Sequence, residues 1–212
     1  MLKNIICFGD SNTHGFIAGL GGRYNENARW TRLLQRHLGL EYYIIEEGLN
    51  GRTTVYDDAE MKNVNGSRYL EVSIATNRPL DLVILMLGTN DTKERFNATV
   101  QDITKGLEQL IKILKNPEIY NNEILIISPI HISDKILNSE YCESFGGLKG
   151  AEKSRMLAAS YKKLAEEYGC HFMDAADYAK ADDTDAIHLD AKGHASLAEG
   201  IYHKIKEIER GV

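Results

Sequence analysis

The sequence is poor in cysteine, lacks long apolar runs and carries no cluster of basic residues. Its three cysteines, Cys7, Cys142 and Cys170, are odd in number and lack metal or redox spacing, which fits a reducing compartment. No apolar stretch approaches the ~20 residues needed to span a bilayer. The short apolar run at the amino end stops at Gly9 without the cleavage site of a signal peptide. We therefore expect a cytoplasmic protein without membrane contact.

Acidic residues outnumber basic ones, 31 to 25, and the formal net charge is −6. Lys and Arg lie singly among acidic residues, whereas a nucleic-acid surface needs them clustered. The charge pattern therefore argues against nucleic acid as a partner. What the chain does have is an ordinary globular composition, with 43% hydrophobic and 26% charged residues, and enough length for one continuous core.

Short apolar runs alternate with longer helical patterns along the chain, which predicts an α/β fold with a parallel sheet covered by helices. The expected strands are residues 4–8, 42–46, 82–87, 124–128 and 171–173, and the expected helices are residues 29–38, 67–76, 99–115, 152–168 and 191–209. No repeat, low-complexity segment or linker interrupts this pattern, so residues 1–212 are expected to form one domain.

Two connections are unusually long, residues 55–66 and 130–150. Both leave the carboxyl ends of predicted strands, the rim at which open α/β sheets bind ligands. Long loops in compact domains are often functional. We therefore look for a site along this rim.

Ser11 follows the first predicted strand directly, within the glycine-flanked segment GDSNTHG of residues 9–15. Glycine permits the sharp turn that would present a serine hydroxyl at the rim. The alternative is a plain strand-to-helix turn in which Asp10 or Ser11 caps a helix. This segment alone does not decide between the two.

A nucleophilic serine needs a general base, which is itself oriented by a third group. His188 ends the segment Asp185-Ala186-Ile187-His188, in a loop before the last predicted helix. Such a short loop can fold a carboxylate back onto the imidazole. The alternative is an acidic loop without a catalytic role. Another histidine, His131, lies on a long connection and can line a pocket.

Acyl transfer also needs hydrogen-bond donors for the oxyanion. Asn90 follows the third predicted strand, and Gly51 follows the second, where its N–H group can point inward. The alternative for both is an ordinary turn role, because Asn and Gly are common turn residues. Three strands thus end in a residue that can serve acyl transfer.

Together these motifs resemble the SGNH hydrolase family, also called the GDSL esterase/lipase family. The resemblance lies in Gly9-Asp10-Ser11, the Gly51 turn, Gly88-Thr89-Asn90-Asp91 and Asp185-x-x-His188, which occur in the family's order. Segments 45–49, 52–54, 81–84 and 86–93 are similar to the bacterial arylesterase/acyltransferase branch.

This resemblance implies a flavodoxin-like three-layer α/β/α sandwich whose five-stranded parallel sheet has the order 2-1-3-4-5. It implies Ser11 as nucleophile, His188 as base and Asp185 as the group that orients the base. The oxyanion donors would be the N–H groups of Ser11 and Gly51 and the side chain of Asn90. No metal or other cofactor is implied, so EDTA should leave activity unchanged.

Asp10, His14, Ile187 and His131 are the candidate residues of the substrate pocket. His14 stands where the acyltransferase branch has a tryptophan, and its smaller, polar ring would change the pocket wall. The branch forms homo-oligomers, often octamers, with pockets that favour acetyl-sized acyl groups.

The expected function is a serine esterase that hydrolyses small acetyl-type esters through an acyl-enzyme, with acyl transfer as a side activity. One alternative is a carbohydrate O-deacetylase such as an acetylxylan esterase. Its sugar could stack on aromatic residues of the loops, namely Tyr56, His131, Tyr141 and Phe145, which could instead pack a subunit contact. A second is a flavin-binding, flavodoxin-like protein, since segment 11–15 also resembles a phosphate-binding loop. A yellow colour in the purified protein would favour the flavin.

Overall fold

The computed structural model describes residues 2–211, in which five buried apolar segments form one parallel sheet. The strands are β1 (Lys3–Gly9), β2 (Tyr42–Gly48), β3 (Leu82–Met86), β4 (Glu123–Ser128) and β5 (His171–Asp174), in the order β2-β1-β3-β4-β5. All four neighbouring pairs are parallel. The expected strand order is therefore confirmed.

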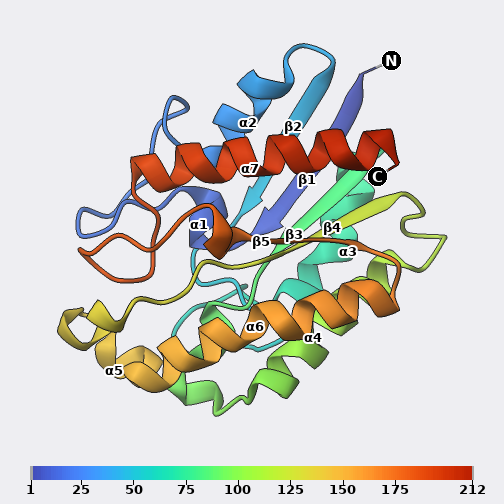
Figure 1. Ribbon diagram of the computed structural model, residues 1–212. Coiled ribbons are helices and arrows are strands. Elements are labelled where there is room, and N and C mark those ends of the chain that lie inside the picture. The colour runs from blue at the N-terminus through green and yellow to red at the C-terminus, as the bar shows by residue number, and fades with distance from the viewer. Residues whose placement is uncertain (1, 212) are drawn as a thin grey trace.

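Helices cover both faces of the sheet and make the three expected layers (Figure 1). They are α1 (Ser11–His14), α2 (Trp30–Leu38), α3 (Gly66–Asn77), α4 (Val100–Leu114), α5 (Cys142–Phe145), α6 (Leu148–Glu167) and α7 (Ala191–Arg210). The helices α2 and α7 pack on the face that carries Ile5, and α3, α4 and α6 pack on the face that carries Ile6. The two faces are both apolar because successive strand residues point to opposite sides.

The segment after β4 contains more helix than the sequence predicts. The predicted helix at residues 152–168 begins earlier, at Leu148, and the connection before it contains α5 and a 3₁₀-helix at Asp134–Asn138. Gly146 and Gly147 have positive φ angles of 66° and 58°, which separate α5 from α6. Gly150 lies in the first turn of α6, and glycine is a weak helix former, so the sequence pattern predicts a later start for this helix. Here it is required by packing, since a Cβ atom would lie 2.4 Å from the Phe145 carbonyl oxygen.

None of the helices within residues 2–211 combines the length and apolar character that a membrane crossing needs.

Candidate active site

The carboxyl ends of the central strands meet beside α1, at the end of the sheet toward which the strand arrows point (Figure 1). Asp10 starts α1 by accepting a hydrogen bond of 2.9 Å from the Asn12 N–H group. The first residue of this short helix is Ser11, so its hydroxyl lies directly beyond β1. Gly48 at the end of β2 lets α1 approach closely, since a Cβ there would lie 2.2 Å from the His14 nitrogen.

Ser11, His188 and Asp185 form a continuous hydrogen-bonded chain. His188 Nε2 lies 2.8 Å from Ser11 Oγ, and His188 Nδ1 lies 2.6 Å from Asp185 Oδ2. All three residues are buried, with Asp185 only 1% exposed. With its N–H on Nδ1 toward the carboxylate, the imidazole presents the Nε2 lone pair to the serine hydroxyl. This arrangement can remove a proton from Ser11.

Asp185 is fixed by backbone as well as by the imidazole. Its Oδ1 accepts hydrogen bonds from the N–H groups of Ile187 at 3.0 Å and His188 at 2.9 Å. Burial by itself raises the pKa of Asp185, but the hydrogen bonds and charge of His188 outweigh it and hold that pKa below its usual value. The turn also places Ala186 at a φ of 67°, a backbone conformation that non-glycine residues rarely adopt. The carboxylate is therefore held charged and aimed at His188.

Asn12 joins the serine turn to the histidine loop. Its Oδ1 accepts a hydrogen bond of 2.9 Å from the Leu189 N–H, and its Nδ2 donates one of 3.3 Å to the Ile187 carbonyl oxygen. These two bonds bracket His188 in the sequence. No role for Asn12 was expected from the sequence, and its position directly after Ser11 is the only signal that could have suggested one.

The two expected oxyanion residues lie at the same end of the sheet. Gly51 has a φ of 78°, in the left-handed region that favours glycine, and a Cβ at this position would also press on Met61 Sδ at 2.5 Å. Asn90 Nδ2 donates a hydrogen bond of 3.1 Å to the carbonyl oxygen of Arg52. An amide nitrogen carries two hydrogens, so the second remains available to a ligand.

A buried carboxylate holds these two segments together. Asp91 accepts hydrogen bonds from the Thr54 N–H at 2.9 Å and from the Thr54 hydroxyl. Arg52 donates to the Gly9 carbonyl oxygen at 2.9 Å and so ties the same segment to the end of β1. The strand ends that carry Ser11, Gly51 and Asn90 are therefore locked to one another.

A cavity of about 420 Å³ opens over these residues. Its wall includes both polar reacting groups and apolar side chains: Ser11, Phe16, Asn50, Gly51, Glu60, Met61, Asn90, Lys93, Arg95, Tyr141, Ser144, Phe145, Ile187 and His188. Phe16 and Tyr141 flank the imidazole, with ring centroids 4.6 Å and 6.0 Å from that of His188. Such a mixture of apolar walls and a few polar groups is typical of small-molecule sites.

The structure places one of the four expected pocket residues on the cavity wall. Ile187 lines the cavity, whereas Asp10, His14 and His131 are not among its lining residues. Asp10 is 1% exposed and serves as the cap of α1. The carbonyl oxygen of His14 accepts a hydrogen bond of 2.7 Å from Arg23 Nε. His131 lies just beyond the end of β4.

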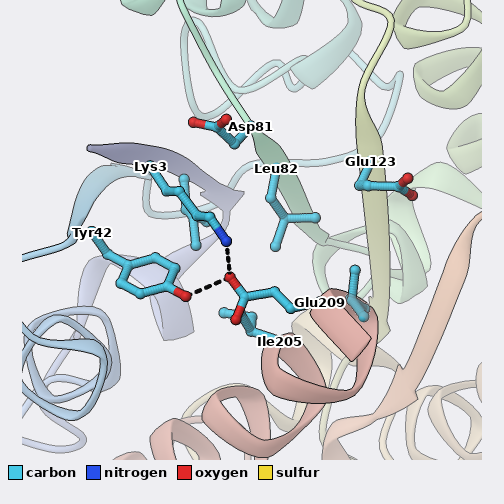
Figure 2. A pocket seen from close by; sticks show the side chains of 9 residues that line it. Lys3, Tyr42, Asp81, Leu82, Glu123, Ile205 and Glu209 are labelled. Carbon is cyan, nitrogen blue, oxygen red and sulfur yellow. Dashed lines mark hydrogen bonds and ion pairs between the residues drawn. The ribbon is translucent and has the colours of Figure 1, made fainter. Parts of the chain in front are cut away.

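A second cavity, of about 240 Å³, lies at the opposite end of the sheet, where the strands begin (Figure 2). Lys3 and Tyr42 both point toward Glu209 and donate hydrogen bonds to its carboxylate. Lys206 pairs with the same carboxylate at 3.0 Å. Within residues 2–211, no serine, cysteine or histidine lines this cavity. Three charged or polar side chains, those of Lys3, Tyr42 and Lys206, thus converge on the one carboxylate of Glu209.

Replacing Asp10 with asparagine is expected to stabilise the fold more at pH 7.5 than at pH 4.5. Burial raises the pKa of Asp10 to about 6 from an ordinary value of 3.8, so the folded state holds this proton more tightly than the unfolded state. The wild-type free energy of unfolding therefore falls by roughly 2–3 kcal/mol as the pH rises from the ordinary pKa of 3.8 to above the raised pKa of about 6, because Asp10 then loses its proton. Asparagine can still cap α1 and has no such dependence. Urea unfolding of both proteins at the two pH values measures the difference; an equal effect at both would contradict a raised pKa.

Residues 7–196 match the GDSL-like Lipase/Acylhydrolase family, over most of the chain and with Ser11 and His188 inside the match. The chain belongs to the GDSL-like lipase/acylhydrolase family. It is therefore a carboxylic ester hydrolase, as the motifs indicated, and this assignment disfavours the flavin-binding interpretation.

Several solved structures are similar to this chain over nearly its whole length. A carbohydrate acetylesterase from Sinorhizobium meliloti is 36% identical, with 97% of this chain and 99% of that chain covered and a TM-score of 0.89. The aryl esterase of M. smegmatis is 34% identical, with the same coverage and a TM-score of 0.90. Both comparisons support the three-layer fold and the esterase class.

A curated relative, an acetylxylan esterase from Xylanibacter ruminicola, is 25% identical over 231 residues. The match covers 95% of this chain but 43% of that protein, so the chain spans less than half the length of this relative.

Proposed function

We propose that this chain hydrolyses small, acetyl-type esters with Ser11 as nucleophile, His188 as base and Asp185 as the group that orients the base. The observation that carries the proposal is the unbroken chain of hydrogen bonds, 2.8 Å from His188 to Ser11 and 2.6 Å from His188 to Asp185. Ser11 and His188 line a cavity together with the candidate oxyanion residues Gly51 and Asn90.

In the first half-reaction, Ser11 Oγ attacks the ester carbonyl carbon while its proton moves to His188 Nε2. The carbonyl oxygen becomes an oxyanion, which the N–H groups of Ser11 and Gly51 and the Asn90 amide stabilise. The C–O bond to the alcohol then breaks, and His188 gives its proton to the leaving oxygen. An acyl group remains on Ser11.

In the second half-reaction, a water molecule attacks the acyl carbon and His188 takes its proton. The bond to Ser11 Oγ breaks, that oxygen regains a proton from His188, and the carboxylic acid leaves. An alcohol that attacks in place of water would give acyl transfer, which we propose as a side activity. Both routes use the same residues.

Replacing Asn90 with alanine is expected to lower kcat for phenyl acetate by about 10²–10³-fold, because one oxyanion donor is lost. The Arg52 carbonyl oxygen, which Asn90 contacts at 3.1 Å, orients that donor in the wild type. Steady-state kinetics on wild type and variant measure the effect. Asn121→Ala, at an exposed position far along the chain, is the matched control. Turnover within a few-fold of wild type in Asn90→Ala would remove Asn90 from the oxyanion hole.

A carbohydrate deacetylase is the second candidate function. The Sinorhizobium meliloti relative is named a carbohydrate acetylesterase, and the Xylanibacter ruminicola relative an acetylxylan esterase. Of the aromatic residues considered for sugar stacking, Tyr141 and Phe145 line the cavity. Tyr56 instead stacks on Phe96, with ring centroids 5.1 Å apart.

We also propose that the chain forms a homo-oligomer. Leu137 and Leu148, which both lie within residues 130–150, are 54% and 40% exposed and offer apolar surface for such a contact. The octameric state, the cytoplasmic location and the single domain of residues 1–212 stay predictions.

A further inference from the structure

Lys93 is a buried lysine in the wall of the candidate active site. It lines the same cavity as Ser11 and His188, yet the residue is only 6% exposed. Its backbone N–H donates to the Asn90 carbonyl oxygen at 3.3 Å, so it closes the short helical turn that carries the proposed oxyanion amide. A lysine is rarely buried unless it is paired.

Among residues 2–211, no acceptor lies within hydrogen-bonding distance of the Lys93 ammonium group. Its one ion pair, with Asp58 Oδ2, spans 4.0 Å, and within residues 2–211 no hydrogen bond from Nζ is present. Asp58 is instead bound by Arg95 at 2.7 Å, and Arg95 also pairs with Glu60. Lysine offers three N–H donors and no acceptor, so these donors need oxygen atoms from elsewhere. Burial also lowers the pKa of Lys93, because partial removal from water disfavours the charged form.

The surroundings of Lys93 favour a neutral, oxygen-rich ligand over an anion. Two cations, Lys93 and Arg95, face two carboxylates, Asp58 and Glu60, so the charges balance. Glu60 also lines the cavity and can accept hydrogen bonds from hydroxyl groups. The ring of Phe145, with its centroid 5.8 Å from Lys93 Nζ, adds an apolar wall. Donor, acceptor and aromatic surface together match a ring that carries several hydroxyl groups.

The position of those hydroxyl groups within the substrate follows from the proposed function, on which this inference rests. An acetyl group has one carbonyl oxygen, and that oxygen belongs to the oxyanion donors. The acceptor for Lys93 must then come from the alcohol part of the ester. We propose that Lys93 is a specificity-determining residue whose Nζ hydrogen-bonds a hydroxyl group of the alcohol, so that the preferred substrates are acetate esters of sugars.

The test compares two acetate esters of similar size, a monoacetylated methyl xyloside and cyclohexyl acetate, which lacks further oxygen atoms on its ring. We expect wild type to have the higher kcat/KM on the xyloside. Lys93→Met keeps the length of the side chain without its donors, and should lower the ratio of the two kcat/KM values by about tenfold, since hydrogen bonds to charged groups are the stronger ones. Lys93→Gln keeps a neutral donor, so its ratio should lie between those of wild type and Lys93→Met. This variant carries the test if Lys93→Met does not fold.

Lys149→Met is the matched control, because the Lys149 side chain is 73% exposed and pairs with Glu94 at 3.4 Å. It should leave the ratio at its wild-type value. An equal fall on both esters in Lys93→Met would show a structural role and overturn the inference. No preference of wild type for the xyloside would overturn it too, and would leave the proposed function standing if phenyl acetate is hydrolysed. If wild type hydrolysed none of the three esters (the xyloside, cyclohexyl acetate and phenyl acetate), the proposed function itself would be refuted.

Discussion

Replacing Ser11 with alanine is expected to lower kcat for phenyl acetate by about 10⁵-fold or more, as loss of the nucleophile does in other serine hydrolases. The acyl-enzyme can no longer form, and only binding and the oxyanion donors remain. Folding should be little changed, because Ser11 Oγ makes its one side-chain hydrogen bond to His188. Steady-state kinetics with freshly prepared, separately purified protein measure the loss.

The control for this variant is Ser196→Ala, at an exposed position on α7. It should keep wild-type turnover. Full activity in Ser11→Ala would mean that another group performs the reaction. A loss accompanied by a large drop in melting temperature would point to a folding defect instead.

Replacing Asp185 with asparagine is expected to lower kcat by about 10⁴-fold. The asparagine can present an N–H group to His188 Nδ1, where the wild type has a carboxylate oxygen at 2.6 Å. The imidazole would then carry its own N–H on Nε2, toward Ser11, and could not accept the serine proton. The positive charge that forms on the ring would also lose its partner.

Asp183→Asn is the matched control for Asp185→Asn, because this carboxylate lies in the same loop but is 68% exposed and pairs with Lys135. It should keep wild-type kinetics. Equal losses in both variants would assign the effect to the loop rather than to the contact between Asp185 and His188. Single-turnover assays would place the loss in the acylation and deacylation steps.

The strands and most helices were predictable because burial imposes strong patterns on the sequence. The segment of β3, Leu82–Met86, is a continuous apolar run with no exposed residue, as strands covered on both faces require. The start of α6 at Leu148 was not predictable, since Gly150 weakens the helical pattern and its reason is contact with Phe145. The four-residue helix α5 is too short to leave a periodic signal.

The arrangement of the candidate site was predictable to a similar degree. Ser11, Asp185 and His188 were expected near one another because strand ends converge at one rim, and the structure brings them within hydrogen-bonding distance. The cavity wall was less predictable, because it depends on which side chains the long connections bring inward. Lys93 illustrates this limit, since neither its burial nor its lack of a close acceptor can be read from the residue type.

The most direct test of the central claim is the intact mass of the protein after reaction with a p-nitrophenyl phosphonate ester. Ser11 Oγ would attack phosphorus and expel nitrophenolate, leaving one stable adduct in place of the acyl group. We predict a single-adduct mass shift in wild type, together with loss of esterase activity, and no shift in Ser11→Ala. An adduct that persists in Ser11→Ala, or a wild type that hydrolyses phenyl acetate yet takes no adduct, would contradict Ser11 as the nucleophile.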